Sequence, residues 1–338
     1  MQIRMSDVAK RARVSVTTVS HAINSTRPVA EETRDRILKA ARELNYYRNA
    51  SARLLVRGRG DSFGLIISDI ENPFFPELIK AFQLAARESG FDVLLCITNY
   101  DSEEARKAVQ RMMENRVLGV ALMTSQFEAD LIDELVNNDT PAVRLDSGLA
   151  KRSVSDIRLD YSRGAGQAIA HLQQLGHRRL AFVTGPQSRV SAVTYTNAIL
   201  TAMVSSGLPE PQLVEGNNRV EGGADATRKL LLNNSRPSAI LCGNDLAAVG
   251  ALQVIQEAGL RVPEDISVIG CDDIAFARHT TPALTTVRIP RDELGRHAFF
   301  SLLKMHNSKT RRSVKLTVET ELVIRRSTGR APGSEVAS

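Results

Sequence analysis

The chain has 338 residues, of which 43% are hydrophobic and 24% charged, as expected for a protein with two or three folded domains and a sizeable core. No apolar run approaches the roughly 18 residues that a membrane-spanning helix needs, and the N-terminus is polar and charged. We therefore expect no membrane partner and no secretion.

The positive charge is concentrated at the N-terminus. Residues 1–60 hold 13 Lys and Arg against 5 Asp and Glu, a net charge of +8, whereas the remaining residues hold 31 against 33. Coulomb attraction and counterion release make a polyanion the expected partner of the N-terminal segment.

The three cysteines, Cys96, Cys242 and Cys271, lie in or beside apolar runs, and no Cys-x-x-Cys pair occurs. This pattern indicates buried, reduced thiols in a cytoplasmic protein, with no metal and no cofactor.

Residues 1–47 predict three short helices, the second of which covers residues 16–24. At helical spacing its residues Val19, Ala22 and Ile23 share one face, and short polar side chains without acids occupy the others. Ser6 and Ser15 are the expected N-caps of the first two helices. A second helix after a short turn, with such a polar face, is typical of a helix-turn-helix that reads the DNA major groove.

Residues 48–62 predict a basic linker that contains one or two helical turns and ends at Gly58 and Gly60. From Phe63 onward short β-branched runs alternate with helical stretches, which indicates parallel sheets covered by helices. The runs are 63–68, 92–97, 117–123, 141–145, 180–184, 238–242 and 266–270. The helical stretches are 74–90, 102–115, 128–138, 162–176, 190–206, 222–234 and 244–259.

Many short motifs resemble the LacI/GalR family of bacterial regulators, in the family's order, over roughly residues 4–328. They include Asp7-Val8-Ala9-Lys10-Arg11-Ala12, Thr18-Val19-Ser20, Ala52-Arg53-x-Leu55, Asn72-Pro73-Phe74-Phe75, Gly176-His177-Arg178, Gly243-Asn244-Asp245, Gly270-x-Asp272-Asp273 and Pro282-x-Leu284-Thr285-Thr286-Val287. Within the family, the headpiece from Val8 to Arg34 is most similar to that of the purine-responsive members.

The resemblance implies an all-α helix-turn-helix headpiece and an α/β periplasmic-binding-protein-like core of two doubly wound parallel-sheet subdomains. The expected boundaries are 1–47 for the DNA-binding domain, 48–62 for the hinge, 63–328 for the effector-binding and dimerisation core, and 329–338 for a disordered tail. Subdomain N would comprise about 63–160 and 290–320, and subdomain C about 161–289 and 321–328. The implied function is a repressor that binds an inverted-repeat DNA operator as a homodimer and responds to a small effector.

The resemblance also assigns roles on DNA. Base contacts are expected from Val16, Thr17, His21 and Leu55, the last as a wedge in the minor groove. Backbone contacts are expected from Thr18, Ser20, Asn24, Thr26, Arg27, Tyr46 and Arg53. Arg13 stands where the family often has Gly, and Arg48 where it often has Pro.

The effector is expected at the carboxyl ends of the parallel strands. The candidate residues are Phe74, Phe75, Ser125, Asp160, Arg189, Ser191, Asn218, Asn244 and Asp272. Asn244 and Asp272 suit hydroxyl-rich ligands, with turn capping as their alternative role.

The pocket departs from the purine-responsive members. Ser147 and Asn218 replace aromatic residues, Tyr195 replaces an Arg, and Ile289 replaces a Gln. A purine is therefore not carried over as the ligand. The resemblance implies a sugar or sugar derivative as the default effector, and Arg158 and Arg189 leave an anionic one open.

Three alternatives remain open: a small-solute-binding protein with the same core, a regulator that responds to a purine, and an enzyme. No Gly-x-Ser-x-Gly, Walker-type or His-Glu-x-x-His motif supports an enzyme, so no catalytic residues are expected.

Overall fold

The structure, a computed structural model, describes residues 3–24, 27–46, 60–124, 129–146, 152–233, 235–308 and 310–333. The chain divides into two compact units, Met1–Gly60 and Asp61–Ser338.

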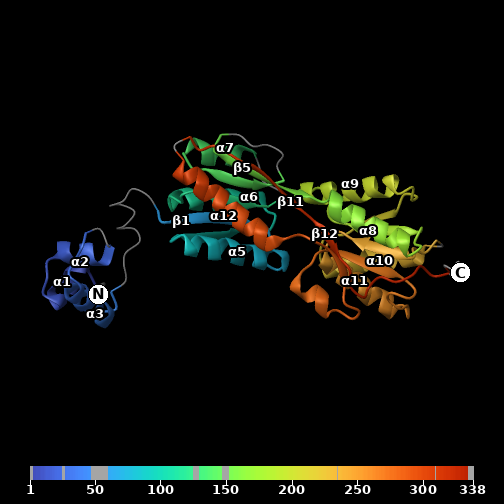
Figure 1. Cartoon of the computed structure of the whole chain (residues 1–338), viewed down its shortest axis with the longest axis horizontal. Helices are drawn as coiled ribbons and strands as arrows, with labels where there is room; N and C mark the ends of the chain where they lie inside the picture. The colour runs from blue at the N-terminus through green and yellow to red at the C-terminus, as the bar shows by residue number, and fades with distance from the viewer. Residues whose placement is uncertain are drawn as a thin grey trace. The chain divides into compact units, whose positions relative to one another are not determined.

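The described part of the N-terminal unit contains the helices α1 (Met5–Ala12), α2 (Val16–Asn24) and α3 (Glu31–Glu43) (Figure 1). Val8, Val19 and Ile37, one from each helix, are completely buried and form the centre of its small core. The Arg36 guanidinium ties α3 to the end of α1, because its Nε donates to the Ala12 carbonyl at 3.0 Å.

The ends of α1 and α2 test the N-caps that the sequence predicts. Ser15 caps α2 as predicted, since its Oγ accepts from the Thr18 N–H at 3.0 Å. The prediction for Ser6 is wrong: α1 already begins at Met5, and the Asp7 carboxylate accepts from the Arg4 N–H at 2.8 Å. Arg13 ends α1 in the left-handed region at φ 55°, which explains why Gly suits this turn.

Two six-stranded sheets form the framework of the second unit (Figure 1). In the first sheet the strand order is β11-β5-β4-β3-β1-β2, and in the second it is β12-β10-β9-β8-β6-β7. The strands of the first sheet are β1 (Ser62–Ile67), β2 (Asp92–Ile97), β3 (Val120–Met123), β4 (Ala142–Leu145), β5 (Val154–Asp160) and β11 (Lys315–Glu319). Those of the second are β6 (Leu180–Thr184), β7 (Gln212–Glu215), β8 (Ala239–Cys242), β9 (Ser267–Asp272), β10 (Thr285–Arg288) and β12 (Glu321–Val323).

All neighbouring strands run parallel except β10 and β12. In register, Ile67 lies beside both Ile97 and Met123, so three strands of the first sheet end at the same level. The carboxyl ends of the strands are therefore gathered at one edge of each sheet, as the βαβ pattern predicts.

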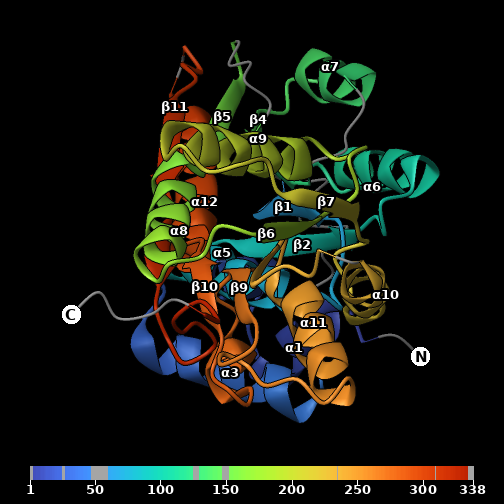
Figure 2. The ribbon, with the colours of Figure 1, turned by 90° about the vertical axis from the view of Figure 1, so that its right-hand side faces the viewer.

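Helices cover both sheets (Figures 1 and 2). The first sheet carries α5 (Phe74–Glu88), α6 (Ser102–Glu114), α7 (Ala129–Asn137) and α12 (Arg291–Asn307). The second carries α8 (Ser162–Gln174), α9 (Val190–Ser205), α10 (Val220–Leu232) and α11 (Asp245–Glu257), and the 3-10 helix η1 (Ala275–His279) follows β9. The sequence predicted no element for α12, although Leu294, Ala298 and Leu302 are buried at four-residue spacing along it.

Helices α10 and α11 pack closely because glycines line their contact. A Cβ on Gly223 would lie 2.2 Å from the Ala247 carbonyl oxygen, and one on Gly250 would lie 2.0 Å from that of Val220. A larger residue at either position would push the helices apart.

The chain crosses between the two sheets three times. The crossings lie at Tyr161 after β5, at Ile289 and Pro290 after β10, and at Thr320 between β11 and β12. The backbone N–H and Oγ1 of Thr320 both donate to the Asp160 carbonyl, at 3.1 and 3.0 Å, which ties two of the crossings together. These links hold the strand ends of one sheet against those of the other.

Residues 329–331 were assigned to the tail from sequence, yet they pack on the second sheet. The Ala331 N–H donates to the Leu175 carbonyl at 2.8 Å, and Ala331 is buried. The Gly329 carbonyl accepts from Nε2 of the buried His177 at 3.0 Å. His177 Nδ1 lies 2.9 Å from Ser238 Oγ. The imidazole thus links the segments just before β6 and β8 to Gly329.

We predict that His177→Ala lowers the free energy of unfolding by about 3 kcal/mol, because it opens a cavity and leaves buried polar groups unpaired. Urea unfolding followed by circular dichroism measures this loss. The exposed His297, which pairs with Glu293 on the surface of α12, is the matched control, and His297→Ala should change little.

Burial lowers the pKa of His177 below its usual 6.5. The stability that the neutral imidazole contributes is therefore present above pH 6.5 and is lost as the pH falls through the folded-state pKa. The His177→Ala variant should lose this acid-side slope, and an unchanged slope would contradict the assignment.

Candidate functional site

The exposed side of α2 presents the residues that the sequence assigned to base contacts. Val16 is 47% exposed, although it is apolar, and Thr17 beside it is exposed as well. His21 is half-buried one turn further along the helix. The inward residues of α2 pack on the other two helices, so this side remains available for the edges of bases.

The described backbone-contact candidates lie on α2 and in the segments before and after α3. Thr18, Ser20 and Tyr46 are half-buried, and Arg27 is exposed. Thr26, Arg53 and the wedge residue Leu55 lie outside the described residues, as does the side chain of Asn24.

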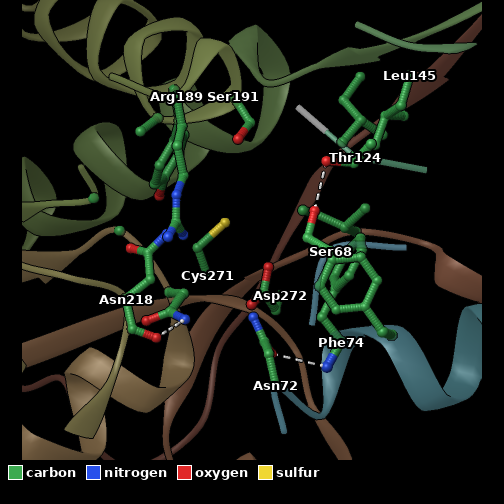
Figure 3. A pocket seen from close by; sticks show the side chains of 18 of the residues that line it. Ser68, Asn72, Phe74, Thr124, Leu145, Arg189, Ser191, Asn218, Cys271 and Asp272 are labelled. Atoms are coloured by element: carbon green, nitrogen blue, oxygen red, sulfur yellow. Dashed lines mark hydrogen bonds between the residues drawn. The ribbon is translucent and has the colours of Figure 1, made fainter. Parts of the chain in front are cut away.

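A cavity of about 770 Å³, including the part open to solvent, lies between the two sheets of the second unit. Figure 3 shows Ser68, Asn72, Phe74, Thr124 and Leu145 on one wall. Arg189, Ser191 and Asn218 lie on the opposite wall, with Cys271 and Asp272 between the two.

The lining residues lie in the carboxyl-terminal halves of strands, in the loops that follow them and at the starts of the next helices, because both sheets point their carboxyl ends at the cavity. Seven of the nine candidates from sequence line it: Phe74, Phe75, Arg189, Ser191, Asn218, Asn244 and Asp272. Ser125 lies outside the described residues. Asp160 is not part of the lining, and its carboxylate instead accepts from the Ser162 N–H at 2.9 Å at the start of α8.

Aromatic rings make up much of the cavity wall. Phe74 and Phe75 are both buried, and their ring centroids lie 5.2 Å apart in an edge-to-face arrangement. Tyr195 packs edge-to-face on Phe182, with centroids 5.7 Å apart, and its ring is tilted by 42° against that of Tyr161, with centroids 5.1 Å apart. Such rings cover the apolar faces of a ligand.

Asn244 caps α11, which is the alternative role that the sequence left open. Its Oδ1 accepts from the Ala247 N–H at 2.9 Å, and its Nδ2 donates to the Asn218 carbonyl at 2.9 Å. Asn244 thereby positions Asn218, whose backbone is in the left-handed region at φ 62°. A Cβ on Gly185 would lie 2.6 Å from Asn218 Oδ1, so Gly185 is needed to admit this side chain.

Asp272 has its carboxyl buried at the end of β9. Burial raises its pKa well above the ordinary value, and repulsion from the buried Asp245 adds to the shift. Its backbone is strained at φ 113°, and its carbonyl accepts from the Arg291 guanidinium. Asp272 lines the cavity, so its carboxyl can meet a ligand.

Two further buried polar atoms in the cavity wall have no hydrogen-bond partner in the described part of the chain. They are Tyr195 Oη and Asn218 Oδ1. A phenol and an amide oxygen that are left unpaired suit hydroxyl groups, because a hydroxyl both donates and accepts. Burial raises the pKa of Tyr195 well above its usual value, so the phenol is a neutral donor.

The charges of the cavity are few. The Arg189 guanidinium lies over the Tyr100 ring, 3.5 Å from its centroid, and thus makes a cation–π contact across the cleft. Arg158, the other cation considered from sequence, is exposed on β5 and is not part of the lining.

Sequence reasoning missed Tyr100, Ser68 and Thr124. Ser68 Oγ donates to Thr124 Oγ1 at 2.7 Å, and each residue directly follows a strand. That position after an apolar run was a usable signal for both. Tyr100 lies three residues beyond β2 and enters the cavity through two successive left-handed residues, Asn99 and Tyr100, which no pattern indicated.

Comparisons with known proteins match both units. Residues 4–49 match the family "Bacterial regulatory proteins, lacI family", and residues 169–328 match "Periplasmic binding protein-like domain". The chain is 37% identical over 332 residues to the "HTH-type transcriptional repressor PurR" of Salmonella paratyphi B, covering 97% of each chain.

Solved structures agree. The lac repressor dimer bound to operator and the anti-inducer ONPF has a TM-score of 0.84 at 27% identity, covering 97% of this chain and 100% of that one. A LacI family transcriptional regulator from Enterococcus faecium with bound ribose has a TM-score of 0.72 at 27% identity, covering 79% and 98%.

Among the described residues no helix has the length and apolar character to cross a membrane.

We predict that Asp272→Asn stabilises the core at pH 8. A carboxyl with a raised pKa contributes stability that is present below the unfolded-state value of about 4 and is lost as the pH rises. Asn is uncharged at every pH and tolerates positive φ better than most residues, so the variant should lose this alkaline-side slope. Urea unfolding from pH 5 to 8 tests this, and a parallel slope in variant and parent would contradict it.

Proposed function

The chain belongs to the LacI family of bacterial regulatory proteins, and on that premise we propose that it is a transcriptional repressor whose operator affinity is set by a small effector. The observation that carries the proposal is the combination, in one chain, of a helix-turn-helix and a polar cavity between two sheets. The full-length similarity to a transcriptional repressor supports it. A solute-binding protein with the same core would leave residues 4–49 unexplained.

The repressor acts as a homodimer on an inverted-repeat operator. The lac repressor dimer bound to operator supports this assembly, because it matches nearly the whole of this chain. Residues 1–47 form the DNA-binding domain, 48–62 the hinge, and 63–328 the effector-binding and dimerisation core. Two headpieces on one dimer read half-sites about one helical turn apart.

In the headpiece, Val16, Thr17 and His21 contact base edges, and Leu55 enters the minor groove at the operator centre. The half-buried Thr18, Ser20 and Tyr46 and the exposed Arg27 bind phosphates, together with Asn24, Thr26 and Arg53. Since DNA is the partner, the protein works in the cytoplasm, and no catalytic role is assigned to it.

The effector is a sugar or sugar derivative, and a neutral one fits best. The cavity offers aromatic faces, neutral hydroxyl and amide groups, and two unpaired polar atoms at Tyr195 and Asn218. Its lining cation, Arg189, already stacks on Tyr100. The regulator with bound ribose supports a sugar at this place in the fold.

We predict that His21→Ala changes sequence preference and that Leu55→Ala weakens specific binding by about 1–3 kcal/mol. The measurement is titration of an operator selected from random DNA, with non-specific DNA as the reference, at fixed salt. His297→Ala on the core is the control. Unchanged affinity and preference in both variants would refute the assigned contacts.

We predict that a neutral sugar raises the melting temperature, since a ligand at about a hundredfold its Kd stabilises the folded state by about 2.7 kcal/mol. The screen includes neutral sugars, sugar phosphates, sugar acids and nucleobases. Asn218→Ala should abolish the shift, whereas Arg158→Ala should keep it. A shift with nucleobases alone would instead establish the purine-responsive alternative.

A further inference from the structure

The cleft has a hinge side and a mouth side. The three crossings of the chain lie next to β5, β10, β11 and β12, which are at one end of the strand order in each sheet. β1 with β2, and β6 with β7, are at the other end of their sheets. No covalent connection joins the described sheets there, so contacts between side chains must hold the mouth closed.

One ion-pair cluster spans this mouth. Arg219, between β7 and α10, places Nη1 2.6 Å from Glu71 Oε2 and Nη2 3.0 Å from Asp69 Oδ2. Both carboxylates follow β1 of the other sheet. The Asp69 side chain is only 9% exposed, and its Oδ1 accepts from the Glu71 N–H at 2.8 Å, so it is held in place for the arginine.

The position of Arg219 is not explained by its own helix. It is the N-cap residue of α10, where its side chain makes no capping bond and where the helix dipole disfavours a cation. Arg189 occupies the same N-cap position on α9 and likewise reaches across the cleft, to the Tyr100 ring. The loops before α9 and α10 thus each carry an arginine whose side chain contacts the other subdomain.

The hinge side is built differently. Arg291 is 6% exposed, and its Nη2 donates to the Asp273 carbonyl at 2.7 Å and to Glu77 Oε2 at 2.7 Å. Such a buried, multiply bonded guanidinium costs much to separate. Arg219 is 46% exposed and Glu71 is 73% exposed, so water and salt reach the mouth contact, which can break while the hinge stays intact.

We propose that Arg219, Asp69 and Glu71 form a latch that sets the fraction of molecules with a closed cleft. Arg219 is outside the cavity lining. It therefore determines effector affinity and residence time through closure and not through contact with the ligand. This consequence for the effector rests on the proposed function, whereas the latch itself does not.

The test measures cleft opening without effector or DNA. Spin labels are attached at Gln110→Cys on α6 and Lys229→Cys on α10, while the native cysteines are buried. Pulsed electron paramagnetic resonance gives the distance distribution in full-length protein. We expect Arg219→Gln to raise the ratio of open to closed molecules about threefold at low salt, and high salt to open the parent but not the variant.

Arg228→Gln is the matched control. Arg228 is also an exposed arginine of α10, but its partners, Asp225 at 2.8 Å and Glu257 at 3.6 Å, belong to the same subdomain. Asp69→Asn should open the cleft as Arg219→Gln does, and the charge swap Arg219→Glu with Glu71→Arg should restore part of the closed population.

The proposal is overturned if Arg219→Gln and Asp69→Asn give the same distance distribution as Arg228→Gln and the parent. Operator titration of the same variants is a separate measurement. If the protein binds no operator but Arg219→Gln still opens the cleft, the proposed function fails and the latch stands. If it binds operator but Arg219→Gln leaves the distance distribution unchanged, the latch fails and the proposed function stands.

Discussion

The shared direction of the strands is the constraint on which the second unit depends. Because neighbouring strands are parallel almost throughout, each sheet gathers its loops at the carboxyl ends, and three crossings at Tyr161, Pro290 and Thr320 turn those ends toward each other. The cavity is the result, since loops from both sheets have to pack around a common space. Residues from the ends of ten strands, β1 to β10, can then contribute to one site although these ends are far apart in sequence.

The cost of this arrangement is visible in the backbone. Tyr100, Asn218 and Asp272 are in left-handed or strained conformations, and all three line the cavity. Asp272 is also a buried carboxyl with a raised pKa, which a core selected for stability alone would avoid. Strained residues beside unpaired buried polar groups are typical of a place kept for binding.

Close packing between helices joins the elements within each half of the core. Helices α5 and α12 interlock so closely that a Cβ on Gly295 would lie 2.5 Å from the Leu78 carbonyl oxygen. A rotation of one subdomain therefore moves its whole surface, including the start of β1 that follows the linker. In a dimer, such a rotation would change the separation of the two linkers and hence the fit of both headpieces to DNA.

The sequence by itself determined the local features. Ser15 caps its helix, the apolar face of α2 is buried, and the alternation after Phe63 gives parallel sheets, because each depends on neighbours a few residues away. It also placed seven of nine effector candidates in one cavity, since strand ends converge in any such sheet. What only the tertiary structure decided depends on partners far along the chain. The Asp160 carboxylate accepts from the Ser162 N–H, and Arg158 is exposed outside the cavity. Tyr100 lines the cavity from a left-handed turn, and Arg219 pairs with Asp69, which is 150 residues away in sequence. The periodicity of apolar residues cannot predict such contacts, because they depend on how the two folded sheets face each other.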